Sequence, residues 1–200
     1  MRLEYRRDAP LGGKYDTFIP TERLIRHRDA VMGNLAAQLN VLLDGEAERE
    51  LSSIYERPLS GSSRYLRPYI RELREAAGGY IAHSLYFNML CESDGGKSPS
   101  LAFAELLKKS FGSVEGFSCA FRDMARENIG SGFLWLCAEK HRGSGALKLL
   151  YTKNHLLPPD RYRRILALDL WEHAYLDTYG TDVGKYAACY LAAVDWDRVV

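Results

Sequence analysis

The stretch 165-ILALDLWEHAY-175 joins an apolar run to two carboxylates and an imidazole. Its first seven residues, 165–171, are typical of a buried strand, in which Ile165, Ala167 and Asp169 would share one face. A charge at the end of a buried strand is costly unless it is paired or bound to a metal. The charged groups from Asp169 to His173 therefore need partners from elsewhere in the chain.

The remaining elements follow from hydrophobic periodicity and from the positions of Gly, Pro and Ser. Apolar residues at helical spacing predict four helices, at 22–43, from 66 to about 89, at about 101–110 and at 114–127. Two β-like runs joined across 141–145, with the run at 165–171, predict three strands: 130–140, 146–154 and 165–171. The remainder is predicted to be helical, with breaks at Gly180 and Gly184.

These elements predict an α+β fold in two domains. Residues 1–92 would form an N-terminal helical hairpin domain. Residues 93–200 would form a C-terminal α/β domain with a small three-stranded antiparallel sheet.

Composition favours a globular protein and argues against several partners. The chain has 46% hydrophobic residues and a net charge of +1, so it carries no basic field that would favour nucleic acid or an acidic membrane surface. The four cysteines are scattered without metal-binding spacing, and no apolar run is long enough to cross a membrane. We expect a soluble cytoplasmic protein with reduced thiols.

Three of the five histidines, His27, His83 and His173, fall within apolar patterns. Together with Asp169 they would make a site of three imidazoles and one carboxylate, a ligand set suited to iron or manganese. Hydrogen-bonded core histidines are the alternative reading of the same pattern. His141, in a turn, is expected to be solvated.

Five segments of this sequence resemble the iron/manganese superoxide dismutase family. The family signature D-x-W-E-H-A-Y is matched by 169-DLWEHAY-175, and the other matches are 78-GGYIAHSLYFNML-90, 111-FGSVEGF-117, 130-GSGFLWL-136 and 190-YLAAVDWDRV-199. The resemblance implies a homodimer that converts superoxide to dioxygen and hydrogen peroxide, with one manganese or iron ion per subunit.

The resemblance also implies a ligand set. His83, Asp169 and His173 match the second, third and fourth metal ligands of the family. Aligning the segment 27-HRDAVMGNLAAQLN-40 on its last two residues places His27 at the first ligand position. A shift of one helical turn would leave Glu22 or a neighbour near that position instead.

Around the metal, the resemblance implies four further site residues. His155 takes the place of a glutamine that holds solvent on the metal, and Gly79 excludes a second glutamine from the same space. Trp135 and Trp171 would form an apolar wall, with Phe133 in place of a usual tryptophan. Glu172 would reach across a two-fold interface to the ligand histidine of the partner subunit.

Four family positions around the substrate funnel are altered together, at Val31, Leu35, Leu176 and Val183. At each of these positions an aliphatic side chain replaces a polar side chain of the family, which predicts a drier funnel. Retention of all four ligands favours a superoxide dismutase. The altered funnel leaves two alternatives: a weakly active or inactive relative with a structural or binding role, and a mononuclear iron enzyme acting on a small organic substrate.

Overall fold

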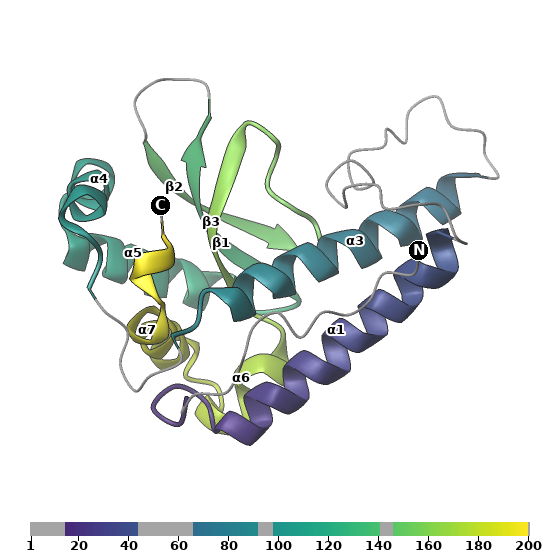
Figure 1. Ribbon diagram of the computed structural model, residues 1–200. Coiled ribbons are helices and arrows are strands. Elements are labelled where there is room, and N and C mark those ends of the chain that lie inside the picture. Colours follow the sequence, from purple (N-terminus) through teal and green to yellow (C-terminus); the bar gives the residue numbers. More distant parts are fainter. Residues whose placement is uncertain (1–14, 44–65, 92–97, 141–145, 200) are drawn as a thin grey trace.

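A hairpin of two long helices forms one side of the molecule (Figure 1). The computed structural model describes residues 15–43, 66–91, 98–140 and 146–199. Helix α1 spans Thr21–Leu43 and helix α3 spans Leu66–Asn88. The two helices run side by side in opposite directions, with Leu39 of α1 packed against Leu73 and Ala77 of α3. The predicted hairpin is confirmed.

The second half contains the predicted antiparallel sheet. Its strands are β1 (Gly132–Glu139), β2 (Leu147–Lys153) and β3 (Tyr162–Asp169), in the order β2-β1-β3. The register of β1 against β3 shifts between Leu136 and Cys137. Because of this bulge, Ile165 packs in the same core cluster as Leu166 and Leu168, while Ala167 packs in another. The prediction that Ile165 shares a face with Ala167 and Asp169 is therefore wrong.

Five helical segments cover the sheet and close the chain: α4 (Leu101–Phe111), α5 (Val114–Glu127), α6 (Glu172–Tyr179), α7 (Val183–Ala193) and the short 3-10 helix η1 (Trp196–Arg198). The predicted break at Gly180 is present, but Gly184 lies inside α7. Asp182 caps α7 by accepting a hydrogen bond from the backbone N–H of Lys185. A Cβ at position 184 would lie 2.2 Å from Nε of Arg126, so glycine serves close packing there and not a chain break.

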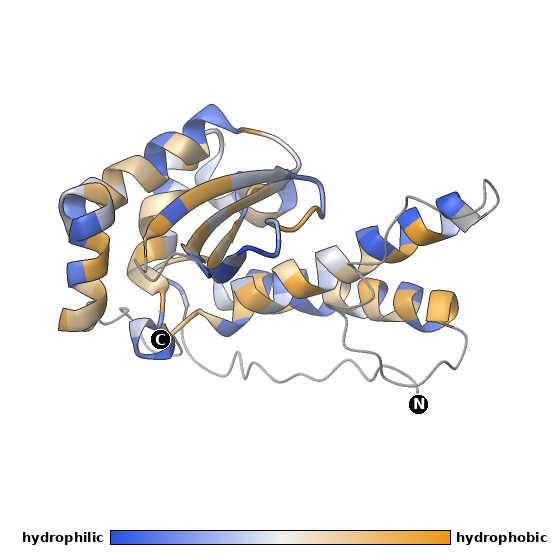
Figure 2. Cartoon of the chain, turned by 90° about the horizontal axis from the view of Figure 1, so that it is seen from above, coloured by the Kyte–Doolittle hydropathy of each residue, from blue (hydrophilic) through white to orange (hydrophobic). Residues whose placement is uncertain are grey.

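The main hydrophobic core takes residues from both halves of the chain, for example Leu24 and Tyr86 with Leu168 and Tyr190. Figure 2 shows apolar strands in the middle of the molecule and mixed hydropathy along both long helices. The α+β fold class is confirmed. The domain boundary predicted after residue 92 stays a prediction, and this boundary and the turn at 141–145 lie outside the described residues. Within the described part of the chain, no helix has the length and apolar character needed to cross a membrane.

Candidate metal centre

Four elements bring His27, His83, Asp169 and His173 together. His27 lies on α1 and His83 on α3, where the hairpin packs against the sheet. Asp169 is the last residue of β3, and His173 lies in the first turn of α6. The signature at the end of β3 therefore finds its partners on the hairpin. Glu22, the alternative in the shifted register, has a side chain 85% exposed and pairs with Arg26.

The distances within this cluster fit a shared ion. Oδ2 of Asp169 lies 3.3 Å from Nε2 of His27, 3.2 Å from Nε2 of His83 and 3.5 Å from Nε2 of His173. One ligand atom from each residue lies within 4.8 Å of all the others. Ligand atoms about 2.1 Å from one ion, at angles between octahedral and tetrahedral, would be about 3.0–3.4 Å apart.

The hydrogen bonding of the cluster also favours a bound cation. Among the described residues, Nε2 of His27, Nε2 of His83 and Oδ2 of Asp169 are buried atoms without a hydrogen-bond partner. Buried polar atoms are rarely left in this state, and here three of them converge on one point. The four residues therefore fit a metal ion.

Three hydrogen bonds orient the candidate ligands. Nδ1 of His83 lies 2.8 Å from the backbone carbonyl of Gly79, so Nδ1–H can donate to it and leave Nε2 free for a metal. The backbone N–H of Trp171 donates to Oδ1 of Asp169 at 2.8 Å, which leaves Oδ2 facing the imidazoles. The hydroxyl of Tyr186 donates to the backbone carbonyl of Asp169 at 2.9 Å.

Burial and the shared carboxylate shift the pKa values of the cluster in different directions. Burial alone would raise the pKa of Asp169, but its contacts with the imidazoles of His173, His27 and His83 hold that pKa well below its usual value. Burial lowers the pKa of His27. Burial also acts to lower the pKa of His173, yet the nearby carboxylate of Asp169 raises it. Asp169 is thus a carboxylate that can ligate a cation.

His155 lies beside this cluster and fills the space above Gly79. Its ring centroid is 5.8 Å from that of His83 and 5.2 Å from that of Trp171. A Cβ at Gly79 would lie 2.9 Å from Nδ1 of His155, so the ring needs the missing side chain. Burial lowers the pKa of His155 to about 4, so the imidazole is neutral near pH 7.

The predicted aromatic wall is divided between two places. Trp171 packs against His155 and, at 5.9 Å, against His173. Phe133 packs against His83 at 5.1 Å, and Trp135 packs against Phe133 at 5.7 Å and donates from Nε1 to Thr152. Phe133, and not Trp135, is therefore the wall residue that packs directly against the candidate ligand His83.

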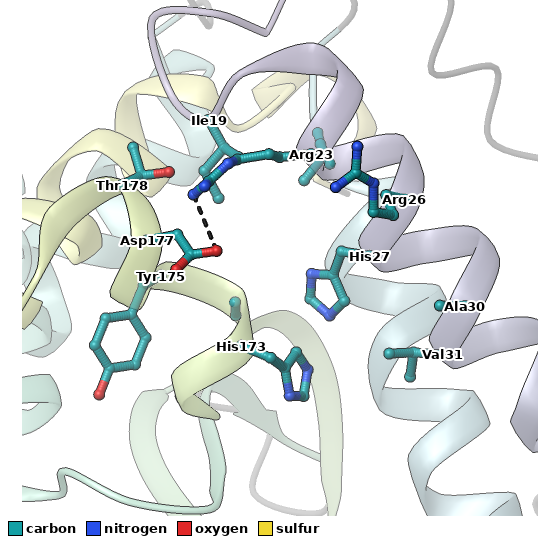
Figure 3. Close-up of a pocket in the computed structure, with 12 residues that line it drawn as sticks. Ile19, Arg23, Arg26, His27, Ala30, Val31, His173, Tyr175, Asp177 and Thr178 are labelled. Carbon is teal, nitrogen blue, oxygen red and sulfur yellow. Dashed lines mark ion pairs between the residues drawn. The ribbon is translucent and has the colours of Figure 1, made fainter.

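A cavity of about 250 Å³ between α1 and α6 leads to His27 and His173. Figure 3 shows both imidazoles pointing into it, with the ion pair of Arg23 and Asp177 above them. The two atoms of that pair, Nη1 and Oδ2, are 3.2 Å apart. Arg26 also lines this space. The mouth of the cavity therefore carries two guanidinium groups.

The altered funnel positions have different surroundings. Val31 lines the cavity, whereas Leu35 and Val183 are buried and Leu176 is 44% exposed on α6. Val31 gives this cavity an aliphatic lining below a polar mouth, and the drier funnel stays a prediction. Glu172 is exposed on α6.

Sequence reasoning did not identify Arg23, Arg26 and Asp177 at the mouth, or Glu75 beside His155. Helical spacing offered a signal for two of them. Arg23 lies four residues before His27, and Glu75 lies one turn before Gly79 and two turns before His83. In the sequence alone, these residues have the pattern of ordinary solvated charges. Their positions near the site follow only from the positions of the candidate ligand histidines.

Comparisons with known proteins identify the family of this chain. A family model described as "Iron/manganese superoxide dismutases, C-terminal domain" matches residues 99–200. A protein named "Superoxide dismutase [Fe]" from Bordetella pertussis is 36% identical over 116 residues, which cover 58% of this chain and 58% of that relative. Another of the same name, from Coxiella burnetii, is 29% identical over 164 residues, 78% of this chain and 83% of the relative. The chain belongs to the iron/manganese superoxide dismutase family.

Proposed function

We propose that this protein is a superoxide dismutase that uses an iron or manganese ion held by His27, His83, Asp169 and His173. The observation that carries the proposal is the convergence of three Nε2 atoms on Oδ2 of Asp169 at 3.2–3.5 Å. Both relatives named above are iron superoxide dismutases by name. A complete ligand set has no use in a purely structural relative, so the enzyme is favoured over a scaffold.

An iron or manganese ion held by these residues would supply the redox chemistry, in which one superoxide is oxidised to dioxygen and a second, with two protons, is reduced to hydrogen peroxide. The chain's own residues hold the site for this ion. The Gly79 carbonyl keeps His83 turned to the centre, and the Trp171 N–H keeps Oδ2 of Asp169 available. The buried carboxylate offsets part of the charge of the cation.

The cavity between α1 and α6 is the route by which the anion would reach the centre. Arg23 and Arg26 place two guanidinium groups at its mouth, paired with the carboxylates of Asp177 and Glu22, and Val31 and Ala30 line it farther along α1. Positive charge around a narrow opening raises the local concentration of a small anion. Superoxide would therefore be attracted at the rim and enter between His27 and His173.

We further propose a homodimer formed around α6. Glu172 lies in the first turn of α6 and is exposed, so it is available to reach His173 of the partner subunit. Leu176, one turn later on the same face, is 44% exposed and would be covered in that interface. The cytoplasm is the proposed location, because none of the four cysteines forms a disulfide within the described part of the chain.

The first test is the metal content of the purified protein, measured beside superoxide consumption on the same sample. Near-stoichiometric iron or manganese with fast superoxide loss is expected. Metal without superoxide turnover would contradict the proposed reaction and favour an iron enzyme with another substrate. A well-folded chain that takes up neither metal would contradict the proposed centre and favour a structural role.

The second test removes one ligand. The variant His83→Ala is expected to lose its metal and its superoxide activity, because the most buried imidazole of the set is gone. Leu73→Ala is the control, since Leu73 is a fully buried residue of the same helix outside the cluster. It should lose about 2–5 kcal/mol of stability but keep its metal. One metal per chain in His83→Ala would refute the ligand assignment.

A further inference from the structure

His155 packs against the backbone of α3 at Gly79. A Cβ at Gly79 would lie within 2.9–3.0 Å of Nδ1, Cε1 and Cγ of its ring, so the imidazole occupies the space of a side chain on α3. Phe133 and Trp171 pack against the same ring, at centroid distances of 6.4 and 5.2 Å. The orientation of the ring is therefore set by packing, and what remains open is which nitrogen carries the proton.

Glu75 is the carboxylate that the structure places beside this ring. Its Oε2 lies 3.7 Å from Nδ1 of His155, a distance for electrostatic attraction and not for a direct hydrogen bond. Glu75 stands one helical turn before Gly79, so its carboxylate meets His155 from the helix that the ring covers.

The two nitrogens of His155 therefore have different surroundings. Nδ1 faces Glu75, and Nε2 lies on the opposite edge of the ring. The other charged or titratable groups that act on His155 are His83 from α3, Asp169 from β3 and His173 from α6, which all belong to the proposed metal centre. In a neutral imidazole one nitrogen donates and the other accepts, and the partner of one nitrogen decides the role of both.

We propose that Glu75 is a positioning residue that keeps the proton of His155 on Nδ1 and thereby presents Nε2 as a hydrogen-bond acceptor. A glutamine at position 155 would carry both a donor and an acceptor on its amide and would not be confined to one role. The indole Nε1 of nearby Trp171 is a buried donor without a hydrogen-bond partner among the described residues. A donor of this kind suits a neighbouring imidazole nitrogen that accepts. The inference rests on the proposed metal centre, but its first test needs no turnover.

Glu75 lines an open groove, so its carboxylate can be changed without disturbing the packing around His155. Glu75 and Glu72 both line an open groove of about 630 Å³ between α1 and α3, together with Val41, Leu42 and His155. The Glu75 side chain is 42% exposed, so replacing it by glutamine leaves the core intact. Glu72→Gln removes the same charge from the same helix and groove and is the matched control.

The direct test is the tautomer of His155 in zinc-loaded protein, read from the two ring ¹⁵N chemical shifts, with His155→Gln identifying the signals. The unmodified chain and Glu72→Gln should show the proton on Nδ1. Glu75→Gln should lose this preference, and both ring nitrogens should move toward an averaged shift. A proton on Nε2 in the unmodified chain, or an unchanged Nδ1–H in Glu75→Gln, would overturn the proposal.

A second measurement, the midpoint potential of the metal, tests whether the contact between Glu75 and His155 affects the metal centre. The midpoint potential of the iron-loaded protein should shift more in Glu75→Gln than in Glu72→Gln, because only Glu75 acts through His155. In the His155→Gln background the two glutamate variants should shift it equally. An excess shift for Glu75→Gln that persists without His155 would show a purely long-range charge effect and would refute the positioning role. Loss of superoxide activity with the tautomer intact would count against the proposed function alone.

Discussion

Gly79 and Gly33 lie inside the two long helices and differ in what a methyl group would meet. At Gly33 nothing lies within 4 Å of an added Cβ, whereas at Gly79 the ring of His155 lies at 2.9 Å. Gly33→Ala should stabilise the protein by about 0.5–1 kcal/mol through helix propensity. Gly79→Ala gains the same propensity but must displace the ring, at a cost of about 1–3 kcal/mol. Urea unfolding of both variants measures the difference.

The double variant Gly79→Ala with His155→Ala separates the ring contact from other effects at position 79. Removing the imidazole should restore most of the stability lost by Gly79→Ala, since the three atoms nearest to the added Cβ all belong to that ring. Equal stabilisation by Gly33→Ala and Gly79→Ala would mean that His155 does not lie over Gly79.

The candidate ligands differed in how far the sequence alone could place them. Asp169 and His173 belong to one short motif, and His83 has its own flanking motif, so each could be assigned from its neighbours. His27 lies in a helix whose register could slip by one turn, and only packing of α1 against α3 brings it to Asp169. Glu75 carries no motif, because its role depends on a ring from a distant loop.

Helix α1 presents Arg23, Arg26 and His27 toward the same cavity, so its first turns would serve both the proposed attraction of substrate and the proposed metal binding. Arg26→Gln should lower the kcat/KM for superoxide about twofold at low ionic strength. One charge about 10 Å from an incoming anion in water changes its energy by about 0.4 kcal/mol, which corresponds to that factor. The measurement is the rate at several salt concentrations, and the difference should vanish at high salt.

Lys108→Gln is the matched control for this prediction. Lys108 is an exposed cation on α4 that pairs with a glutamate on its own helix, as Arg26 pairs with Glu22. It does not line the cavity. Equal losses of rate in both variants would show that net charge, and not the cavity mouth, controls the approach of superoxide.

At the level of elements, the sequence predicted all three strands and the principal helices, and its errors have local physical causes. The break expected at Gly184 is absent because Arg126 covers that glycine, a contact that no local pattern reveals. The prediction of the sheet face on which Ile165 lies was wrong, because a bulge in the pairing of β1 with β3 interrupts the alternation of side chains. Both errors arise from contacts between distant segments.

For the whole molecule, the candidate ligands connect the helical hairpin to the sheet and α6. Removal of the metal should therefore lower global stability. An ion at about a thousand times its Kd stabilises the folded state by about 4 kcal/mol, which for a chain of this size shifts Tm by about 8–16 °C. Thermal unfolding of metal-free and reloaded protein tests this. His83→Ala should show no such shift, and a metal-independent Tm would contradict the site.

The proposed dimer is also a property of the whole molecule. Leu176→Glu should give a monomer in sedimentation experiments, because it places a charge next to Glu172 in the proposed interface. Leu101→Glu is the control, as Leu101 is 89% exposed on α4. It should leave the mass unchanged. A Leu176→Glu protein that keeps the mass of a dimer would place the interface elsewhere.

The side chains of His27, His83 and Asp169 are at most 8% exposed, and they come from three elements far apart in the chain. An ion held by these ligands leaves only when a local opening releases several of them at once, which is slow compared with diffusion of free ions. We expect exchange between iron and manganese in the mature protein to follow the rate of that opening. The metal found in each molecule would then record which ion was abundant when the chain folded.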